Sequence, residues 1–389
     1  MKIKLNDNFS LLSQKYLFSE MRDRVEGYKS NGESRKIISL GIGDVSLPIS
    51  SFVADEMARA ARGMSTKKGF RGYGDTRGDK KLREKIVSRY ACRGVELDID
   101  EIFVNDGAKG DLGNINDVLG DNEVVICNPV YPVYFDSAII SGRRVKFVFA
   151  NVENGFLPTP NQLYKKPYVI YLCSPNNPTG AVFSKDDLQK WVDFALESGS
   201  LIVFDAAYES YITDESLPHS IFEMKGAKEC AIEVCSLSKM AGFTGIRCGW
   251  TVIARGNPIY KLWERRQGAK FNGASYISQK GAIASLSENG MRECRQNIEY
   301  YMKNARLMSD FLKRKHVDFV GGVNAPYLWV KCPNKMNSWQ FFDFLLNKSQ
   351  IISTPGVGFG NAGEGYVRFS AFAELNDTLE ALSRMDEIL

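Results

Sequence analysis

The segment Ser236–Trp250 holds one lysine, Lys239, among hydroxyls, glycines and an arginine. A lysine amine forms a Schiff base with a carbonyl cofactor when burial or neighbouring charges lower its pKa. Ser236, Ser238 and Arg247 supply two hydroxyls and a guanidinium fork, the groups that hold a phosphate monoester firmly. The pattern therefore predicts a site for a phosphorylated aldehyde cofactor, with Lys239 as the nucleophile.

Two apolar strands before that segment end in polar side chains. Leu201–Asp205 has the composition of a buried parallel strand, and Tyr208 follows it closely. Tyr168–Cys173 leads into a proline-rich turn that contains Asn177. Because ligands of open α/β sheets gather at the carboxyl ends of strands, Asp205 is expected to pair with a protonated ring nitrogen. Asn177 and Tyr208 are expected to reach a ring oxygen.

Two earlier strands end in the same manner. Glu123–Cys127 leads to two prolines on either side of Tyr131, whose ring is expected to stack on the cofactor. Ile102–Val104 runs into a strand-to-helix turn with Ala108 and Lys109, where free amides suit a phosphate. Each pattern alone also fits a helix cap or an ordinary turn. The evidence for a cofactor site is therefore the order in which the patterns follow one another along the chain.

In this order the segments resemble the fold-type I pyridoxal 5′-phosphate aminotransferases of classes I and II, over nearly the whole chain. Within that superfamily they resemble the LL-diaminopimelate aminotransferase family. The resemblance implies an α/β fold with a large cofactor domain at residues 46–283, built on a mainly parallel sheet in an α/β/α sandwich. A smaller α+β domain is expected from residues 1–45 and 284–389. The motifs that carry the resemblance are Gln14–Phe18, Ile42–Asp44, Arg71–Gly74, Asp106–Lys109, Phe271–Ser275, Ala325–Val330 and Val367–Ser370.

The resemblance also implies a role for each matching residue. Catalysis is expected from Lys239, Asp205 and Tyr208, and Arg368 is expected to clamp the substrate α-carboxylate. Tyr73 is expected to reach in from a second subunit, so a homodimer with shared active sites is expected. The expected cofactor ligands are Tyr73, Ala108, Lys109, Tyr131, Asn177, Asp205, Tyr208, Ser236, Ser238, Lys239 and Arg247. The expected substrate ligands are Tyr16, Gly43, Lys109, Tyr131, Asn177, Asn272 and Arg368.

The implied reaction is a ping-pong amino transfer from LL-diaminopimelate to 2-oxoglutarate, or the reverse transfer from glutamate to tetrahydrodipicolinate. The expected partners are therefore amino-acid and 2-oxo-acid substrates. The implied place of the reaction is the synthesis of lysine and peptidoglycan precursors.

Two departures from the family pattern qualify this expectation. The family usually has an acid two positions after the Gly-Tyr-Gly motif, where it helps to read the distal amino end of the substrate. Here Asp75, Thr76 and Arg77 follow the motif, so the acid is displaced by one position. A displacement of about 1 Å can cost on the order of a hundredfold in rate. Two alternative functions therefore stay open: an aminotransferase for another amino acid, or a pyridoxal phosphate-dependent lyase.

The second departure puts Gly110 and Gly113 in an expected helix. Each glycine lowers the stability of a helix by roughly 1 kcal/mol relative to alanine.

Length and composition indicate the number of domains and argue against several other classes of protein. The 389 residues exceed the roughly 250–300 at which single cores stop growing, so two domains are expected. A net charge of +4 with acids and bases interspersed indicates no nucleic-acid surface. The only histidines, His219 and His316, are too few for a histidine-based metal site, and no metal is expected. Eight cysteines without a Cys-x-x-Cys pair, no signal core and no apolar run of about 18 residues favour a cytoplasmic protein without membrane segments.

Gly358–Gly363 matches the spacing of a dinucleotide-binding loop. The strand expected at Val367–Phe369 follows too soon for a helix, so a turn is the better interpretation. A non-catalytic regulator that keeps the cofactor fold is disfavoured because Lys239 is intact.

Overall fold

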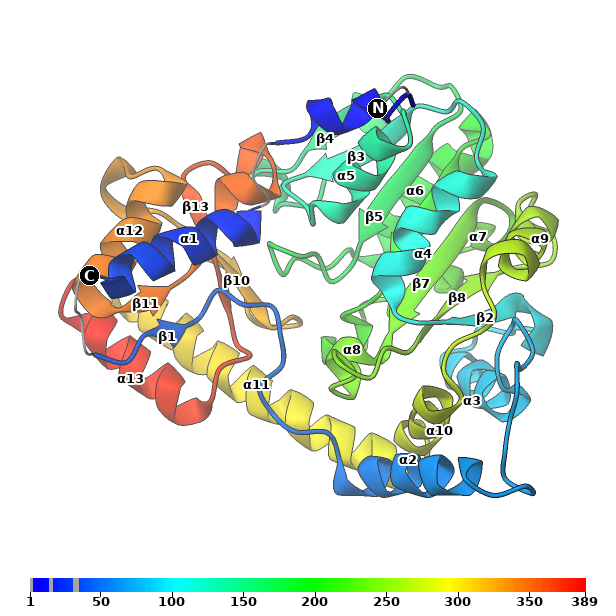
Figure 1. Ribbon diagram of the computed structural model, residues 1–389. Helices are drawn as coiled ribbons and strands as arrows, with labels where there is room; N and C mark the ends of the chain where they lie inside the picture. Colours follow the sequence, from blue (N-terminus) through cyan, green and yellow to red (C-terminus); the bar gives the residue numbers. More distant parts are fainter. Residues whose placement is uncertain (1–2, 14–16, 31–34) are drawn as a thin grey trace.

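The computed structural model describes residues 3–13, 17–30 and 35–389. A seven-stranded sheet forms the centre of its larger part (Figure 1). The strands are β2 (Ile102–Asn105), β3 (Val124–Asn128), β4 (Val145–Phe149), β5 (Val169–Cys173), β6 (Leu201–Asp205), β7 (Ala231–Ser236) and β8 (Gly249–Ile253). They lie in the order β2-β8-β7-β6-β5-β3-β4. Only β8 runs against its neighbours, so the prediction of a mainly parallel sheet is confirmed.

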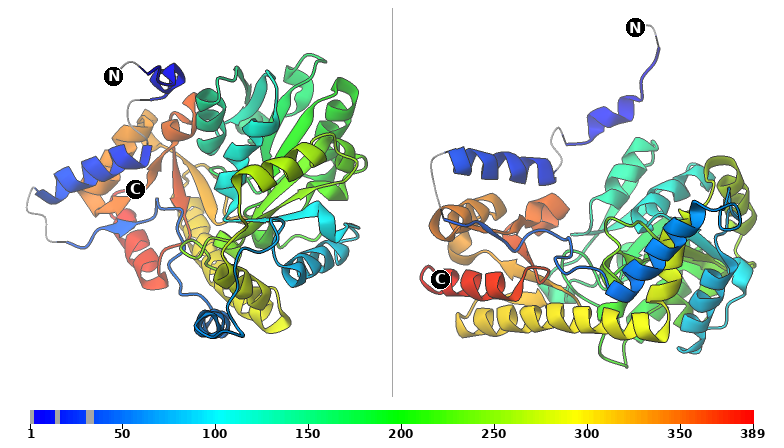
Figure 2. Two further views of the ribbon diagram at one scale, coloured as in Figure 1. Left: turned by 45° about the vertical axis from the view of Figure 1, so that its right-hand side comes forward. Right: turned by 60° about the horizontal axis from the view of Figure 1, so that its bottom comes forward.

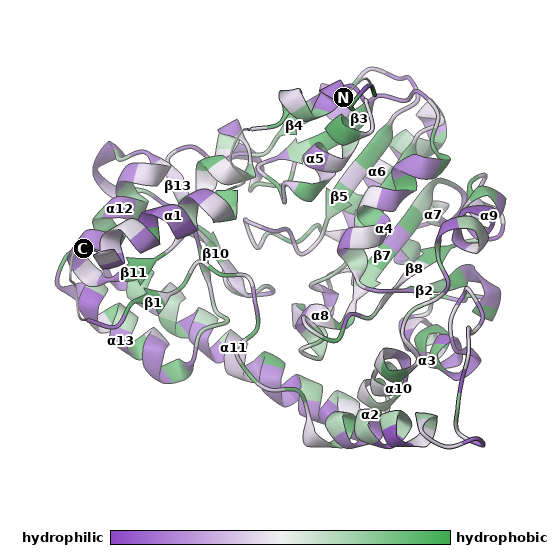
Figure 3. Ribbon diagram, in the orientation of Figure 1, coloured by the Kyte–Doolittle hydropathy of each residue, from purple (hydrophilic) through white to green (hydrophobic). Residues whose placement is uncertain are grey.

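The strands form where the apolar runs of the sequence predict them. The bounds of β2, β3, β5 and β6 agree with the expected strands to within one residue at each end. Every residue of β2, β3, β5, β7 and β8 is buried, because a parallel sheet covered on both faces needs continuous apolar side chains. Figure 3 shows these strands largely hydrophobic, while the helices around them mix hydrophilic and hydrophobic residues.

The larger part also holds helices, some of which flank this sheet (Figure 1). They are α2 (Ser51–Met64), α3 (Lys80–Ala91), α4 (Ala108–Asn114), α5 (Val133–Ile140), α6 (Lys185–Ser198), α7 (Ala227–Cys230), α8 (Leu237–Met240), α9 (Tyr260–Lys270) and α10 (Tyr276–Ser285). Gly110 and Gly113 do lie in α4, which has only seven residues. A Cβ on Gly113 would lie 3.2 Å from Oγ of Ser137 in α5, so glycine allows the two helices to approach closely.

The smaller part is built from segments near both ends of the chain, although the first described helical turn, η1 (Asp7–Leu11), packs on α5 of the larger part. The smaller part holds α1 (Leu17–Ser30), β1 (Ile38–Ser39), α11 (Glu288–Arg314), β9 (Phe319–Gly321), β10 (Tyr327–Lys331), α12 (Ser338–Ser349), β11 (Ile351–Ile352), β12 (Thr354–Pro355), β13 (Tyr366–Ser370) and α13 (Leu375–Asp386). β1 pairs with β11, and an antiparallel sheet has the order β12-β13-β10-β9. The domain boundaries given above stay a prediction.

The helix α11 connects the two parts. It packs on α2 and α10 near its beginning and on α13 and β10 further along (Figure 2). Its buried residues recur every three or four positions, for example Cys294, Ile298, Tyr301 and Ala305, so one continuous apolar stripe faces inward. This 27-residue helix therefore packs on elements of both parts.

Two short helical turns, η9 (Gly356–Phe359) and η10 (Asn361–Gly363), occupy the glycine-rich loop and lead directly into β13. The loop is thus a turn before the Arg368 strand, as predicted. Within the described residues, no helix has the length and apolar character needed to cross a membrane.

Candidate active site

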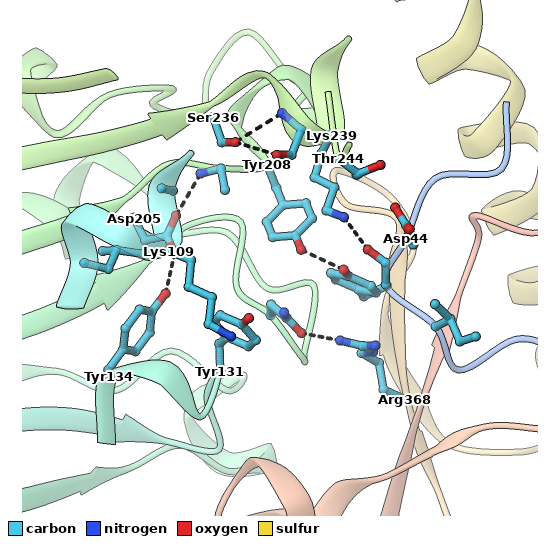
Figure 4. Close-up of a pocket in the computed structure, with 18 of the residues that line it drawn as sticks. Asp44, Lys109, Tyr131, Tyr134, Asp205, Tyr208, Ser236, Lys239, Thr244 and Arg368 are labelled. Carbon is cyan, nitrogen blue, oxygen red and sulfur yellow. Dashed lines mark hydrogen bonds between the residues drawn. The ribbon is translucent and has the colours of Figure 1, made fainter. Parts of the chain in front are cut away.

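A pocket of about 400 Å³ opens where the carboxyl ends of β5, β6 and β7 face β10 and β13 (Figure 4). Its walls therefore come from both parts of the molecule. The predicted site residues that line it are Gly43, Ala108, Lys109, Tyr131, Asn177, Asp205, Tyr208, Ser236, Ser238, Lys239, Arg247 and Arg368.

Lys239 lies in the single helical turn α8. Ser236 caps that turn by accepting the backbone N–H of Ser238 at 3.1 Å, which fixes the lysine at the end of β7. The Lys239 ammonium donates to the backbone carbonyl of Gly43. Burial lowers the pKa of Lys239 from 10.5 to about 8; the charge of Asp44 opposes this shift, and Arg368 and Arg247 add to it. A share of the amine is therefore neutral near pH 7, as a nucleophile requires.

Hydroxyls and a guanidinium gather beside Lys239. Oγ of Ser236 donates to Oγ of Ser238 at 2.9 Å, and Nη1 of Arg247 donates to the same Ser238 oxygen at 3.1 Å. Gly107 has a φ of +113°, and a Cβ there would clash with the Arg247 guanidinium. Glycine at this position therefore lets the arginine lie close to the start of α4.

Asp205 is the last residue of β6 and is only 5% exposed. Its Oδ2 accepts the hydroxyl of Tyr134 at 2.5 Å, and its Oδ1 accepts the backbone N–H of Ala207 at 3.0 Å (Figure 4). Burial raises the pKa of Asp205, and the two donors oppose that rise. A cationic ring nitrogen would compensate the buried carboxylate.

Arg368 comes from β13 and is 1% exposed. It donates to Oδ1 of Asn177 at 2.6 Å and to the carbonyl of Gly41 at 2.7 Å. Its Nε has no hydrogen-bond partner among the described residues. A Cβ on Gly43 would lie 3.4 Å from Nη2 of Arg368, so glycine keeps the space before the guanidinium open. That space suits a carboxylate, which a guanidinium binds through two parallel hydrogen bonds.

Several residues that line the pocket were not predicted, although three of the motifs named above contain some of them. Asp44 belongs to the Ile42–Asp44 motif and Tyr327 to the Ala325–Val330 motif, yet neither side chain received a role. Tyr134 follows Tyr131 by three positions, and nothing local shows that its hydroxyl reaches Asp205. The unpredicted lining residues are Phe18, Ile42, Asp44, Leu112, Tyr134, Ala207, Thr244 and Tyr327.

Two predicted residues within the described part of the chain do not line this pocket, and for a third the structure gives no placement. Tyr16 lies outside the described residues. Tyr73 and Asn272 instead share a separate surface hollow with residues 70–75 and 272–276. Tyr73 is 89% exposed. Within one chain, therefore, neither Tyr73 nor Asn272 contributes to the site that contains Lys239.

The pocket residues fit the expected cofactor. Ser236, Ser238 and Arg247 match a phosphate, the buried carboxylate of Asp205 matches a protonated pyridine nitrogen, and Lys239 lines the same pocket with a lowered pKa. The open space before Arg368 leaves room for a substrate carboxylate.

Comparison with known proteins agrees with this fit. The model of the aminotransferase class I and II family matches residues 35–382. The chain is 46% identical to an LL-diaminopimelate aminotransferase of Bacteroides fragilis, over 98% of both chains. It is also 46% identical to one of Prochlorococcus marinus, over 99% of this chain and 100% of the other. A solved L,L-diaminopimelate aminotransferase from Chlamydomonas reinhardtii superposes with a TM-score of 0.94 at 38% identity, covering 100% of this chain and 99% of the other.

Proposed function

Because the chain belongs to the aminotransferase class I and II family, which depends on pyridoxal 5′-phosphate, we propose that it transfers an amino group from LL-diaminopimelate to 2-oxoglutarate. The reverse direction, from glutamate to tetrahydrodipicolinate, would serve the synthesis of lysine and peptidoglycan precursors. The observation that carries the proposal is that one pocket collects Lys239, Asp205 and Arg368. The relatives at 46% identity that bear the name LL-diaminopimelate aminotransferase support the choice of donor.

Bound pyridoxal 5′-phosphate supplies an electron sink for negative charge at the substrate Cα. Ser236, Ser238 and Arg247 hold its phosphate through hydroxyl and guanidinium donors. The carboxylate of Asp205 accepts the N–H of the ring. Ala108 and Lys109 add contacts at the start of α4, Asn177 and Tyr208 hold the ring oxygen, and Tyr131 covers the ring face.

Lys239 has two tasks. Its pKa of about 8 would leave part of the amine neutral near neutral pH, as an attachment point for the cofactor aldehyde requires. The same Nζ would accept and return the proton of the substrate Cα. Arg368 binds the α-carboxylate meanwhile, with its guanidinium plane held by Asn177 and Gly41.

The charges on the pocket walls suit a substrate with two carboxylates and two amines. Lys109 and Asp44 lie on opposite walls of the pocket (Figure 4). A distal carboxylate is expected to approach Lys109, and a distal ammonium to approach Asp44. Arg368 serves the α-carboxylate and leaves these two groups for the far end of the substrate.

We also propose a homodimer with shared sites. A tyrosine that is 89% exposed and shares a hollow with Asn272 suits a surface that meets another copy of the chain. In that arrangement Tyr73 contacts the phosphate, and Asn272 the substrate, in the partner's pocket. A reducing cytoplasmic location is proposed as well, supported by the free thiols of all eight cysteines.

A second candidate is the same chemistry on another amino acid. Asp75, the displaced acid, already accepts the backbone N–H of Arg77 at 2.8 Å and pairs with Arg83 at 3.2 Å. Arg77 itself pairs with Glu264. Asp75, the acid nearest to the family's usual position, is therefore already bound to residues of its own chain. This favours an amino-donor substrate that has no distal amine.

The first experiment is the absorbance spectrum of the cofactor-loaded protein before and after addition of LL-diaminopimelate without any oxo acid. Loss of the visible cofactor band supports the proposed donor, and an unchanged band moves the donor to the second candidate. Product analysis after addition of 2-oxoglutarate then separates transfer from elimination, because transfer yields glutamate and a lyase yields ammonia.

A further inference from the structure

Tyr134 is a fully buried tyrosine in the first turn of α5. Its hydroxyl donates to Oδ2 of Asp205 at 2.5 Å (Figure 4). The other oxygen, Oδ1, accepts the backbone N–H of Ala207 at 3.0 Å. Each carboxylate oxygen thus has one donor from the protein, which leaves acceptor capacity on both oxygens for a ligand.

The ring of Tyr134 is held by aromatic neighbours. It stacks on Tyr171 at a centroid distance of 5.1 Å and an interplanar angle of 21°. It also meets the edge of Tyr131 at 6.1 Å and 85°. A change of the Tyr134 side-chain rotamer would break both contacts, so the hydroxyl is fixed against Asp205.

This hydroxyl keeps its proton near neutral pH. Burial raises the pKa of Tyr134 well above 10, and the charge of Asp205 raises it further. Burial also raises the pKa of Asp205, and Tyr134 is the largest influence that lowers it again. A donor to a carboxylate favours the charged carboxylate over the protonated acid.

The consequence concerns a single proton. When a buried carboxylate accepts a hydrogen bond from a ring nitrogen, the proton between them belongs to the more basic of the two. A second donor on the carboxylate lowers its basicity, so the proton remains on nitrogen and the ring keeps its positive charge.

We propose that Tyr134 is a positioning residue that fixes the Asp205 carboxylate and, by donating to Oδ2, keeps the shared proton on the ring nitrogen of the cofactor. This role rests on the proposed function, because it requires a bound pyridoxal phosphate. It does not depend on which amino acid is the donor. A purely structural Tyr134 would fill the core between β5 and the pocket without affecting the titration of Asp205.

The test compares Tyr134→Phe with the matched control Tyr171→Phe. Both variants remove one buried hydroxyl from the same aromatic stack, but Tyr171 donates to the carbonyl of Leu112 at 3.0 Å and not to Asp205. The measured quantity is the pKa of the Asp205 carboxyl in the cofactor-free protein, followed by carbon NMR with labelled aspartate and assigned by an Asp205→Asn spectrum. Loss of a hydrogen bond to a charged group predicts a rise of about one to two pH units in Tyr134→Phe. Tyr171→Phe is expected to leave this pKa unchanged.

A second readout uses the loaded protein. Tyr134→Phe is expected to shift the pH at which the visible spectrum of the bound cofactor changes, and to lower kcat for any accepted amino acid with little change in KM. Equal Asp205 titrations in wild type and Tyr134→Phe, or equal shifts in both variants, would overturn the role. If the protein turned over other amino acids but not LL-diaminopimelate, the proposed donor would be contradicted. The result of the Asp205 titration would still stand.

A third variant covers the case in which Tyr134→Phe does not fold. Replacement of Tyr134 by 3,5-difluorotyrosine keeps the ring and makes the hydroxyl a stronger donor. The pKa of Asp205 is then expected to fall below the wild-type value. A rise or no change would contradict the proposal.

Discussion

The hydroxyl oxygens of Tyr208 and Tyr327 lie 2.7 Å apart, although 119 positions separate the two residues in the chain. The guanidinium of Arg368 lies over the same Tyr327 ring, 4.4 Å from its centroid. Tyr327 thus joins the residue expected to hold the cofactor's ring oxygen to the residue expected to hold the substrate carboxylate. The contact depends on β10 and β13 pairing side by side opposite the end of β6.

Tyr327→Phe removes the hydroxyl from this connection and keeps the ring under Arg368. The lost hydrogen bond frees the Tyr208 hydroxyl, so kcat is expected to fall about three- to tenfold while KM changes little. Steady-state kinetics with the natural donor measure both constants. A rise in KM with unchanged kcat would show that Tyr327 serves the substrate alone.

The rate at which the cofactor-free protein captures pyridoxal phosphate is expected to increase with pH and to level off above about 8. The reason is that Lys239 reacts as the neutral amine, and its pKa is lowered from 10.5 to about 8. Below that value the rate should change about tenfold per pH unit. Stopped-flow absorbance gives this profile.

Two variants check that Lys239 is the titrating group. The charge of Asp44 raises the pKa of Lys239 and that of Arg368 lowers it. Asp44→Asn should therefore move the profile to lower pH, and Arg368→Gln should move it to higher pH. Shifts in the same direction would assign the profile to another group.

Subunit complementation tests the shared site. Tyr73→Ala and Lys239→Ala are each expected to abolish most turnover as separate proteins. A hybrid dimer pairs one pocket that lacks both groups with one that has both, so mixing the variants should restore about a quarter of wild-type activity at random exchange. Activity after co-refolding, with native mass to count the hybrids, is the measurement. No recovery despite abundant hybrids would place Tyr73 in the site of its own chain.

The buried carboxyl of Glu233 predicts a dependence of stability on pH. Burial raises its pKa from 4.5 to about 7, against the donors Tyr90, Ser220 and the backbone of Ile221. A carboxyl with a raised folded-state pKa stabilises the protein fully below about pH 4.5, and this contribution is lost as pH rises through about 7. The loss is on the order of 3 kcal/mol.

Urea unfolding between pH 5 and 8, at fixed cofactor saturation, measures this dependence. Glu233→Gln should flatten the decline, because the amide does not titrate. Burial raises the pKa of Glu209, but Arg89 and other neighbours hold it well below its usual value. Glu209 should therefore change the free energy of unfolding only at lower pH. An unchanged slope in Glu233→Gln would assign the decline to other groups.

The apolar runs determine the central strands by themselves. Leu201–Asp205 is the same segment in the sequence-based prediction and in β6, because a strand buried on both faces needs uninterrupted apolar residues. The same reasoning places Asn177, Asp205 and Lys239 at strand ends on one edge of the sheet. The role of a residue that acts at the end of a single strand can therefore be predicted from the local sequence pattern.

Contacts between distant segments were decided only by the tertiary structure. Nothing near Tyr134 indicates a hydrogen bond to Asp205, which lies 71 positions away, and nothing near Asn272 places it in a hollow with Tyr73. Local pattern reports which face of an element is buried. It does not report which side chain of another element meets that face, because that depends on helix packing, strand order and the pairing of β13 beside β10.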